Sequence, residues 1–141
     1  MKIMSVDLGD ARTGIAICDK LELLASPVCV ISETDRDRLL EKVTDQAKEI
    51  GAELIVVGYP KNMDGSVGDR AQKSDEFAKK LSQSTGITTE LWDERQTTIT
   101  ATNYLNTTNT RGKKRKAVID AVAAVVILES YLNYRKISKN R

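Results

Sequence analysis

Apolar residues mark three short strands at the start of the chain. The predicted strands cover about residues 2–8, 13–18 and 22–31. The third is interrupted by Pro27. The pair Asp19-Lys20 predicts a hairpin between the second and third strands, and the glycine-bearing turn after Asp7 predicts another between the first and second. We therefore expect an antiparallel meander of three strands.

After the meander, the sequence predicts a helix and then a strand that is apolar throughout. Apolar residues recur with helical spacing between Asp35 and Ile50, and Gly51 is well placed to end that helix. Residues 54–57 form an uninterrupted apolar run before Gly58, which is typical of a strand covered on both faces. A helix followed by a buried strand implies a crossover to a parallel neighbour.

The second half of the chain alternates helices and one further strand. We predict a helix over about 69–83, a strand over 88–92, and helices over 97–105 and 114–131. The last helix is apolar nearly all round between Ala117 and Leu128, which is typical of a protein interior. This order of elements predicts an α/β fold in one domain over residues 1–141. Its five-stranded mixed sheet has three antiparallel strands and then two parallel ones, flanked by helices.

Composition removes several classes of chemistry. The chain has no histidine, so serine–histidine triads, histidine-paired cysteine nucleophiles and zincin motifs are excluded. Cys18 and Cys29 lie in apolar stretches without C-x-x-C spacing, which favours buried thiols in a reducing cytoplasm over a disulfide or metal site. Neither a membrane-spanning apolar run nor a cleavable leader is evident, so we expect a soluble cytoplasmic protein. Its chemistry must use carboxylates, lysines or bound metal.

Two isolated acids lie on otherwise apolar elements. Asp7 lies near the end of the first predicted strand, and Asp120 is the only acid between residues 117 and 128. An ionised carboxylate in such surroundings is costly unless a cation meets it. Alternatively, Asp7 begins an ordinary D-x-G turn, and the N-terminal end of the helix macrodipole stabilises Asp120. If Asp7 holds a divalent cation instead, Gly9 would let a ligand approach the backbone and Arg12 would contact a phosphate.

Asp93 and Glu94 close the last predicted strand. With Asp7 and Asp120 they describe a carboxylate cluster for a divalent metal. Because side chains alternate along a strand, only one of this pair can easily face the Asp7 side of the sheet.

Two further segments suit a phosphate-bearing ligand. Residues 58–71, GYPKNMDGSVGDRA, leave the end of a parallel strand, where open α/β sheets bind ligands, although turn formers this dense also make ordinary surface loops. Residues 111–141 hold nine Lys or Arg and two acids, which gives them a net charge of +7. Because the whole chain has a net charge of +2, residues 1–110 have a net charge of −5. This segregation favours a polyanionic partner over a merely solvated surface.

The same residues resemble the YqgF (RuvX) family, small bacterial proteins with a ribonuclease H-like fold that are similar to RuvC resolvases. The matching segments are DLGDARTGIA at 7–16, GYPKNMDGSVG at 58–68, WDERQTT at 92–98 and KRKAVIDAVAAVVIL at 114–128. Gln96 departs from the family, which usually has Leu there, but it neighbours the acids and does not replace them. The order and spacing of four motifs make the resemblance specific.

The resemblance implies a cytoplasmic nuclease connected with maturation of the 5′ end of pre-16S rRNA, with Holliday-junction resolution as the alternative. It assigns catalysis and the binding of Mg²⁺ or Mn²⁺ to Asp7, Glu94 and Asp120. The residues expected to bind substrate are Arg12, Asn62, Lys113, Arg115 and Lys116. The expected partners are RNA or branched DNA and no membrane, and we expect a monomer or homodimer.

Two other functions compete with this interpretation. D-x-G-x-x-x-T-G also opens the phosphate-binding hairpin of actin-like ATPases and sugar kinases, but those proteins need a second lobe and a second glycine-rich loop for which 141 residues leave no room. A non-catalytic nucleic-acid-binding module is the stronger competitor. Such a module would bind RNA with the same affinity after the acids of the carboxylate cluster are neutralised, and it would show no metal-dependent cleavage.

Overall fold

The computed structural model describes residues 1–59, 68–93 and 112–139, with the last helix described by its backbone alone over 112–121 and 138–139. Its elements are β1 (Ile3–Asp7), β2 (Arg12–Cys18), β3 (Ala25–Ser32), α1 (Arg36–Ile50), β4 (Leu54–Tyr59), α2 (Asp69–Thr85), β5 (Thr89–Asp93) and α4 (Gly112–Lys139). The helix predicted over 97–105 lies outside the described residues.

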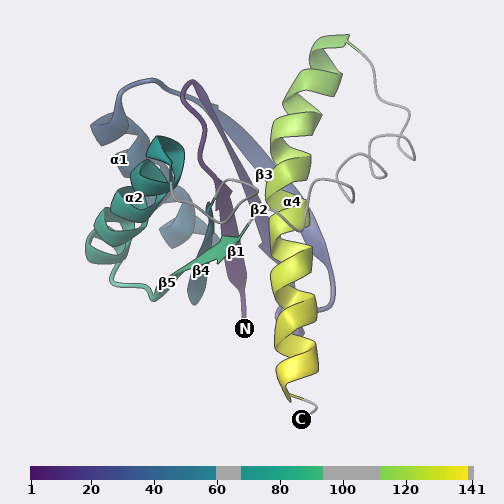
Figure 1. Ribbon diagram of the computed structural model, residues 1–141. Helices are drawn as coiled ribbons and strands as arrows, with labels where there is room; N and C mark the ends of the chain where they lie inside the picture. Colours follow the sequence, from purple (N-terminus) through teal and green to yellow (C-terminus); the bar gives the residue numbers. More distant parts are fainter. Residues whose placement is uncertain (60–67, 94–111, 140–141) are drawn as a thin grey trace.

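The five strands form one mixed sheet in the order β3-β2-β1-β4-β5. β2 pairs antiparallel with both β1 and β3, while β1, β4 and β5 are parallel. Figure 1 shows α1 and α2 on one face of this sheet and α4 on the other. The predicted meander and the two parallel strands that follow it are confirmed.

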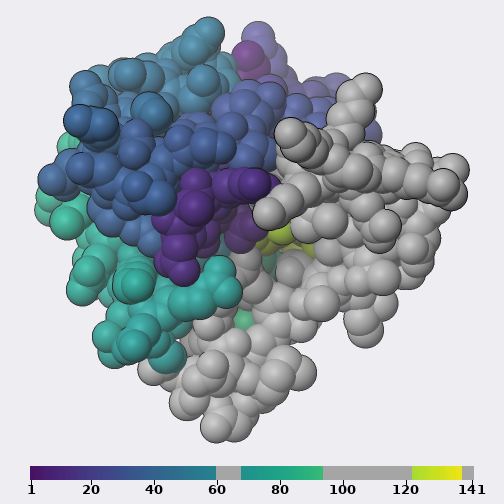
Figure 2. Space-filling view, turned by 90° about the horizontal axis from the view of Figure 1, so that it is seen from above, coloured from purple at the N-terminus to yellow at the C-terminus, as the bar shows by residue number. Residues whose placement is uncertain are grey.

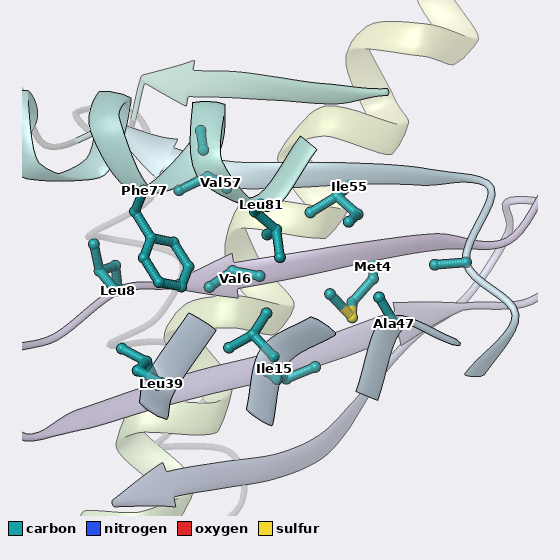
Figure 3. Packing of buried hydrophobic residues seen from close by; sticks show 13 residues of the cluster. Met4, Val6, Leu8, Ile15, Leu39, Ala47, Ile55, Val57, Phe77 and Leu81 are labelled. Atoms are coloured by element: carbon teal, nitrogen blue, oxygen red, sulfur yellow. The ribbon is translucent and has the colours of Figure 1, made fainter. Parts of the chain in front are cut away.

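Each face of the sheet has its own apolar core, because successive strand side chains point to opposite sides. Met4 and Val6 of β1 pack with residues of α1 and α2, among them Leu39 and Phe77, as Figure 3 shows. Ile3 packs on the other face with α4, together with residues of β2 and β4. The central strands are therefore buried on both sides, as the apolar run at 54–57 predicts.

Capping residues fix both ends of α1. The Asp35 side chain accepts hydrogen bonds from the backbone N–H groups of Asp37 and Arg38, and Gly51 ends the helix in the left-handed conformation at φ 74°. These are the start and stop that the sequence predicts.

β3 begins later than the predicted strand over 22–31. A carboxylate oxygen of Asp19 accepts hydrogen bonds from the backbone N–H groups of Leu23 and Leu24, at 2.7 and 3.0 Å, so these residues belong to the turn. Pro27 remains within β3 beside a register shift, where the lack of an N–H group is tolerated.

α4 extends beyond the predicted range of 114–131. Its second half is held by packing, since Tyr131 and Leu132 are buried against the sheet and the Tyr131 hydroxyl donates to Glu90. Every residue from Ala124 to Leu128 is buried, as predicted. Because the helix begins at Gly112, Asp120 lies beyond its first turn. The macrodipole explanation for this acid is therefore wrong, because that effect is confined to the first turn.

Neither cysteine of the chain forms a disulfide, and burial raises the pKa of the Cys18 thiol. Across the part of the chain that is described, no helix has the length and apolar character needed to cross a membrane.

Candidate active site

Asp7 is the last residue of β1 and lies half-buried on the α4 face of the sheet. Two residues earlier on that strand, the buried Ser5 hydroxyl donates a 2.6 Å hydrogen bond to the Ala124 carbonyl of α4. Strand alternation places Asp7 on the same face as Ser5. The predicted metal ligand therefore lies between the sheet and the last helix.

Residues without side chains flank Asp7 on both neighbouring strands. The register pairs Asp7 with Gly14 of β2. It also pairs Val6 with Val57 of β4, so continuing it by one residue places Gly58 beside Asp7. Paired residues share a face of the sheet, so the α4 face is bare on both sides of this carboxylate. A cation bound at Asp7 would therefore meet no side chain from the adjacent position of either neighbouring strand.

Arg12 begins β2 and lies two residues before Gly14 on that strand. Because the intervening Thr13 is fully buried and pairs with Ile31 of the opposite core, alternation places Arg12 on the α4 face. Arg12 and Asp7 thus share one face at one end of the sheet, which agrees with the predicted phosphate contact.

The turn between β1 and β2 is held by contacts within the chain. Arg36 donates a 3.0 Å hydrogen bond to the Gly9 carbonyl and a 3.3 Å one to Asp10. A Cβ atom added at Gly9 would lie 2.0 Å from the Arg12 carbonyl oxygen. The close approach at Gly9 is therefore made by the chain's own backbone, an explanation that differs from the predicted approach of a ligand. Figure 2, seen from above, shows this purple segment at the surface beside the blue and teal segments that include α1 and α2.

Gly9→Ala is expected to lower the free energy of unfolding by roughly 1–3 kcal/mol, because the Arg12 carbonyl must shift to admit a methyl group. Thermal unfolding followed by circular dichroism measures this. Asp10→Ala in the same turn is the control, since it removes only an ion pair whose acid is 76% exposed. Equal melting temperatures for Gly9→Ala and the unaltered protein would contradict the close contact.

The end of β5 separates the two adjacent acids. The Trp92 indole N–H donates to the Ser130 hydroxyl of α4 at 3.1 Å, and its ring meets Tyr131 edge-on at 5.5 Å. Leu91 packs in the opposite core, so alternation directs Asp93 to the α1 and α2 face, away from the face of Asp7. Glu94 lies outside the described residues.

The backbone of α4 brings Asp120 to the level of Asp7. β1 and α4 run in opposite directions (Figure 1), and the Ser5–Ala124 hydrogen bond fixes their relative position. Two strand residues from Ser5 to Asp7 advance about 6.6 Å, and four helix residues from Ala124 back to Asp120 cover about 6 Å. The two acids therefore occupy matching positions on facing elements.

The remaining predicted residues are only partly placed. Asn62 lies outside the described residues, and Lys113, Arg115 and Lys116 belong to the first turns of α4 by their backbone. Within the residues whose side chains are described, no three metal-ligating groups gather. Sequence reasoning missed Ser5 and the pairing of Asp7 with Gly14 and Gly58. The signal in the sequence that could have indicated them is a polar residue, Ser5, or a glycine within or next to an apolar run.

Comparisons with known proteins agree on a family. A family model described as RuvX, Holliday junction resolvase, matches residues 1–134. A protein of Halothermothrix orenii named "Putative pre-16S rRNA nuclease" is 44% identical over 135 residues, 96% of each chain. A protein of the same name from Carboxydothermus hydrogenoformans is 40% identical over 99% of this chain and all of its own.

Solved structures with low sequence identity share the fold. RuvC of Thermus thermophilus, in complex with a Holliday junction substrate, superposes with a TM-score of 0.64 at 12% identity, over 98% of this chain and 96% of that one. The fowlpox virus Holliday junction resolvase gives a TM-score of 0.56 at 15% identity, over 95% of this chain and 99% of that one. From the family match over residues 1–134 and the relatives that are 40% identical or more, the chain belongs to the RuvX family of nucleases with a ribonuclease H-like fold.

Proposed function

We propose that this chain hydrolyses phosphodiester bonds of pre-16S rRNA during maturation of its 5′ end in the cytoplasm. Asp7, Glu94 and Asp120 would hold Mg²⁺ or Mn²⁺. The observation that carries the proposal is Asp7 at the end of β1, between the bare positions Gly14 and Gly58 and level with Asp120 on α4. Carboxylate oxygens are the hard ligands that these ions prefer, so the donor chemistry fits.

The carboxylates and Arg12 have separate tasks in this mechanism. Divalent ions held by this chain would supply an activated water and stabilise the leaving oxygen, so that no histidine base would be needed. The carboxylates of Asp7, Glu94 and Asp120 hold the ions at the end of the sheet. Arg12 would bind a phosphate oxygen and orient the scissile group beside Asp7. No side chain has to form a covalent bond to the substrate.

Strand alternation favours Glu94 over Asp93 as the third ligand. Trp92 packs against α4 and Leu91 against the opposite core. Side chains two residues apart on a strand share a face. If the chain stays extended past β5, Glu94 would therefore share the α4 face with Trp92, and this is also the face of Asp7. This argument agrees with the family resemblance, which also assigns the role to Glu94.

RNA is the preferred substrate because relatives that match nearly the whole chain carry a pre-16S rRNA nuclease name. The second candidate is a four-way DNA junction, favoured by the family description and by the fold shared with RuvC. Both substrates are polyanions, so the net +7 of residues 111–141 suits either.

The deciding experiment incubates the purified protein with a labelled pre-16S rRNA leader and with a labelled four-way junction. Each substrate is tested with Mg²⁺, Mn²⁺ or EDTA. We expect metal-dependent cleavage of the RNA leader that EDTA stops. Cleavage of the junction alone would make the protein a resolvase, and tight binding without cleavage of either would make it a binding module.

Replacing Lys113, Lys114 and Arg115 with Gln is expected to weaken RNA binding similarly for all sequences, because phosphate contacts carry no sequence information. The dependence of log affinity on log salt should flatten by roughly 0.7 for each phosphate group of a single strand that the variant no longer neutralises. Fluorescence anisotropy across a salt series measures both quantities. Metal binding, measured by calorimetry, should change little. If the variant keeps the RNA affinity and the salt dependence of the unaltered protein, these three side chains are only solvated and do not contact RNA.

A further inference from the structure

The turn between β2 and β3 presents three leucines to solvent. Leu21, Leu23 and Leu24 are 75%, 71% and 67% exposed. The turn is nevertheless ordered, because the Asp19 carboxylate accepts hydrogen bonds from the backbone N–H groups of Leu23 and Leu24. These bonds also lower the pKa of Asp19. A leucine cluster held outward in this way is unusual for a surface that meets only water.

One charged residue of the same turn, Glu22, points inward. Glu22 adopts φ 58°, a backbone conformation that residues other than glycine rarely adopt, and its side chain is only 14% exposed. It pairs with Arg135 of α4 and with the N-terminal amine. The turn is thus anchored by Glu22 while its leucine side chains face out, which is the reverse of an ordinary surface turn.

A groove of about 240 Å³ runs beside the leucines, between the turn and α4. Leu23 and Leu24 line one side, and Glu129, Asn133 and Lys136 of α4 line the other. Glu129 and Lys136 are seven residues apart, so they lie on one stripe of the helix. Within the described part of the chain, neither has an ion-pair partner.

We propose that this surface joins two copies of the chain about a two-fold axis, with the leucines of each copy packed into the groove of the other. The surface is self-complementary in shape because it carries a protrusion beside a groove. It is self-complementary in charge because an axis crossing α4 between residues 132 and 133 sets Lys136 of one copy opposite Glu129 of the second copy. A two-fold interface requires both properties.

The position of this surface is compatible with catalysis. The β2–β3 turn and the second half of α4 lie at the opposite end of the sheet from Asp7 (Figure 1). Two copies joined there leave both candidate active sites open to nucleic acid.

Sedimentation equilibrium of the full chain tests the proposal. We expect a dimer whose dissociation constant rises at least about tenfold in Leu23→Asp, a change of roughly 1.4 kcal/mol. Glu129→Lys and Lys136→Glu should each weaken the dimer about threefold or more, because each creates two like-charge pairs across the axis. The double variant should return to within about twofold of the unaltered protein, since it restores the opposite-charge pairs.

Lys73→Glu is the control for charge reversal, because Lys73 is exposed on α2, on the other face of the sheet. It should leave the dissociation constant unchanged. Matching melting temperatures for all variants will show that the fold is intact. A monomer at every concentration, or a double charge variant weaker than both single variants, would overturn the proposal.

Discussion

Asp7→Asn is expected to reduce phosphodiester cleavage by at least about 10³-fold, which is roughly 4 kcal/mol of transition-state stabilisation. Asparagine keeps the size of the side chain but removes the negative charge that a divalent ion requires. The bare sheet on either side of Asp7 offers no nearby strand side chain that could replace it. Asp120→Asn should have an effect of the same size. Single-turnover cleavage of labelled RNA in Mg²⁺ measures both.

The fold should survive these substitutions. Neighbouring carboxylates repel one another when no metal is bound, so the melting temperature of either variant in EDTA should be unchanged or higher. Asp10→Asn is the matched control, because Asp10 is an exposed acid in the turn that follows Asp7 and pairs with Arg36. It should retain activity. Full activity in Asp7→Asn or Asp120→Asn would rule out the metal site, and a large loss of stability in EDTA would favour a structural role.

Glu94→Gln is expected to lose cleavage by a similar factor, whereas Asp93→Asn should stay active. The reason is the alternation along β5, which directs Asp93 to the α1 and α2 face, opposite to Asp7. Cleavage and Mn²⁺ binding are measured for both variants, with binding followed by calorimetry. If Asp93→Asn is inactive and Glu94→Gln is active, Asp93 is the metal ligand in place of Glu94, and the carboxylate cluster itself still stands.

Local patterns were enough to predict most elements of this fold. The start of α1 at Asp35 and its end at Gly51 follow from backbone groups that neighbouring residues satisfy. The apolar run at 54–57 predicts a strand buried on both faces, and β4 is buried in this way. Such features depend on residues a few positions apart, which is why a single sequence reveals them.

Long-range packing explains where those predictions were wrong. α4 continues past Tyr131 because Tyr131 meets Trp92 and Glu90, and because Arg135 pairs with Glu22, more than a hundred residues earlier. The bare positions beside Asp7 likewise depend on strand register, which joins Gly14 and Gly58 from separate parts of the chain. No local signal in the sequence specifies either arrangement. Asp7 itself was recognisable because a lone acid in an apolar strand needs a compensating partner.

The hydrogen bond between Ser5 and Ala124 has a consequence for the order in which activity arises during synthesis. It joins residues 119 positions apart, and α4 is the element that carries Asp120 to the level of Asp7. Ribosomes make the chain from its N-terminus, so the β1 carboxylate emerges long before the helix that faces it. A nascent chain that has folded only as far as β5 lacks Asp120. This enzyme should therefore be unable to cut RNA near the ribosome that is making it until its last helix has docked.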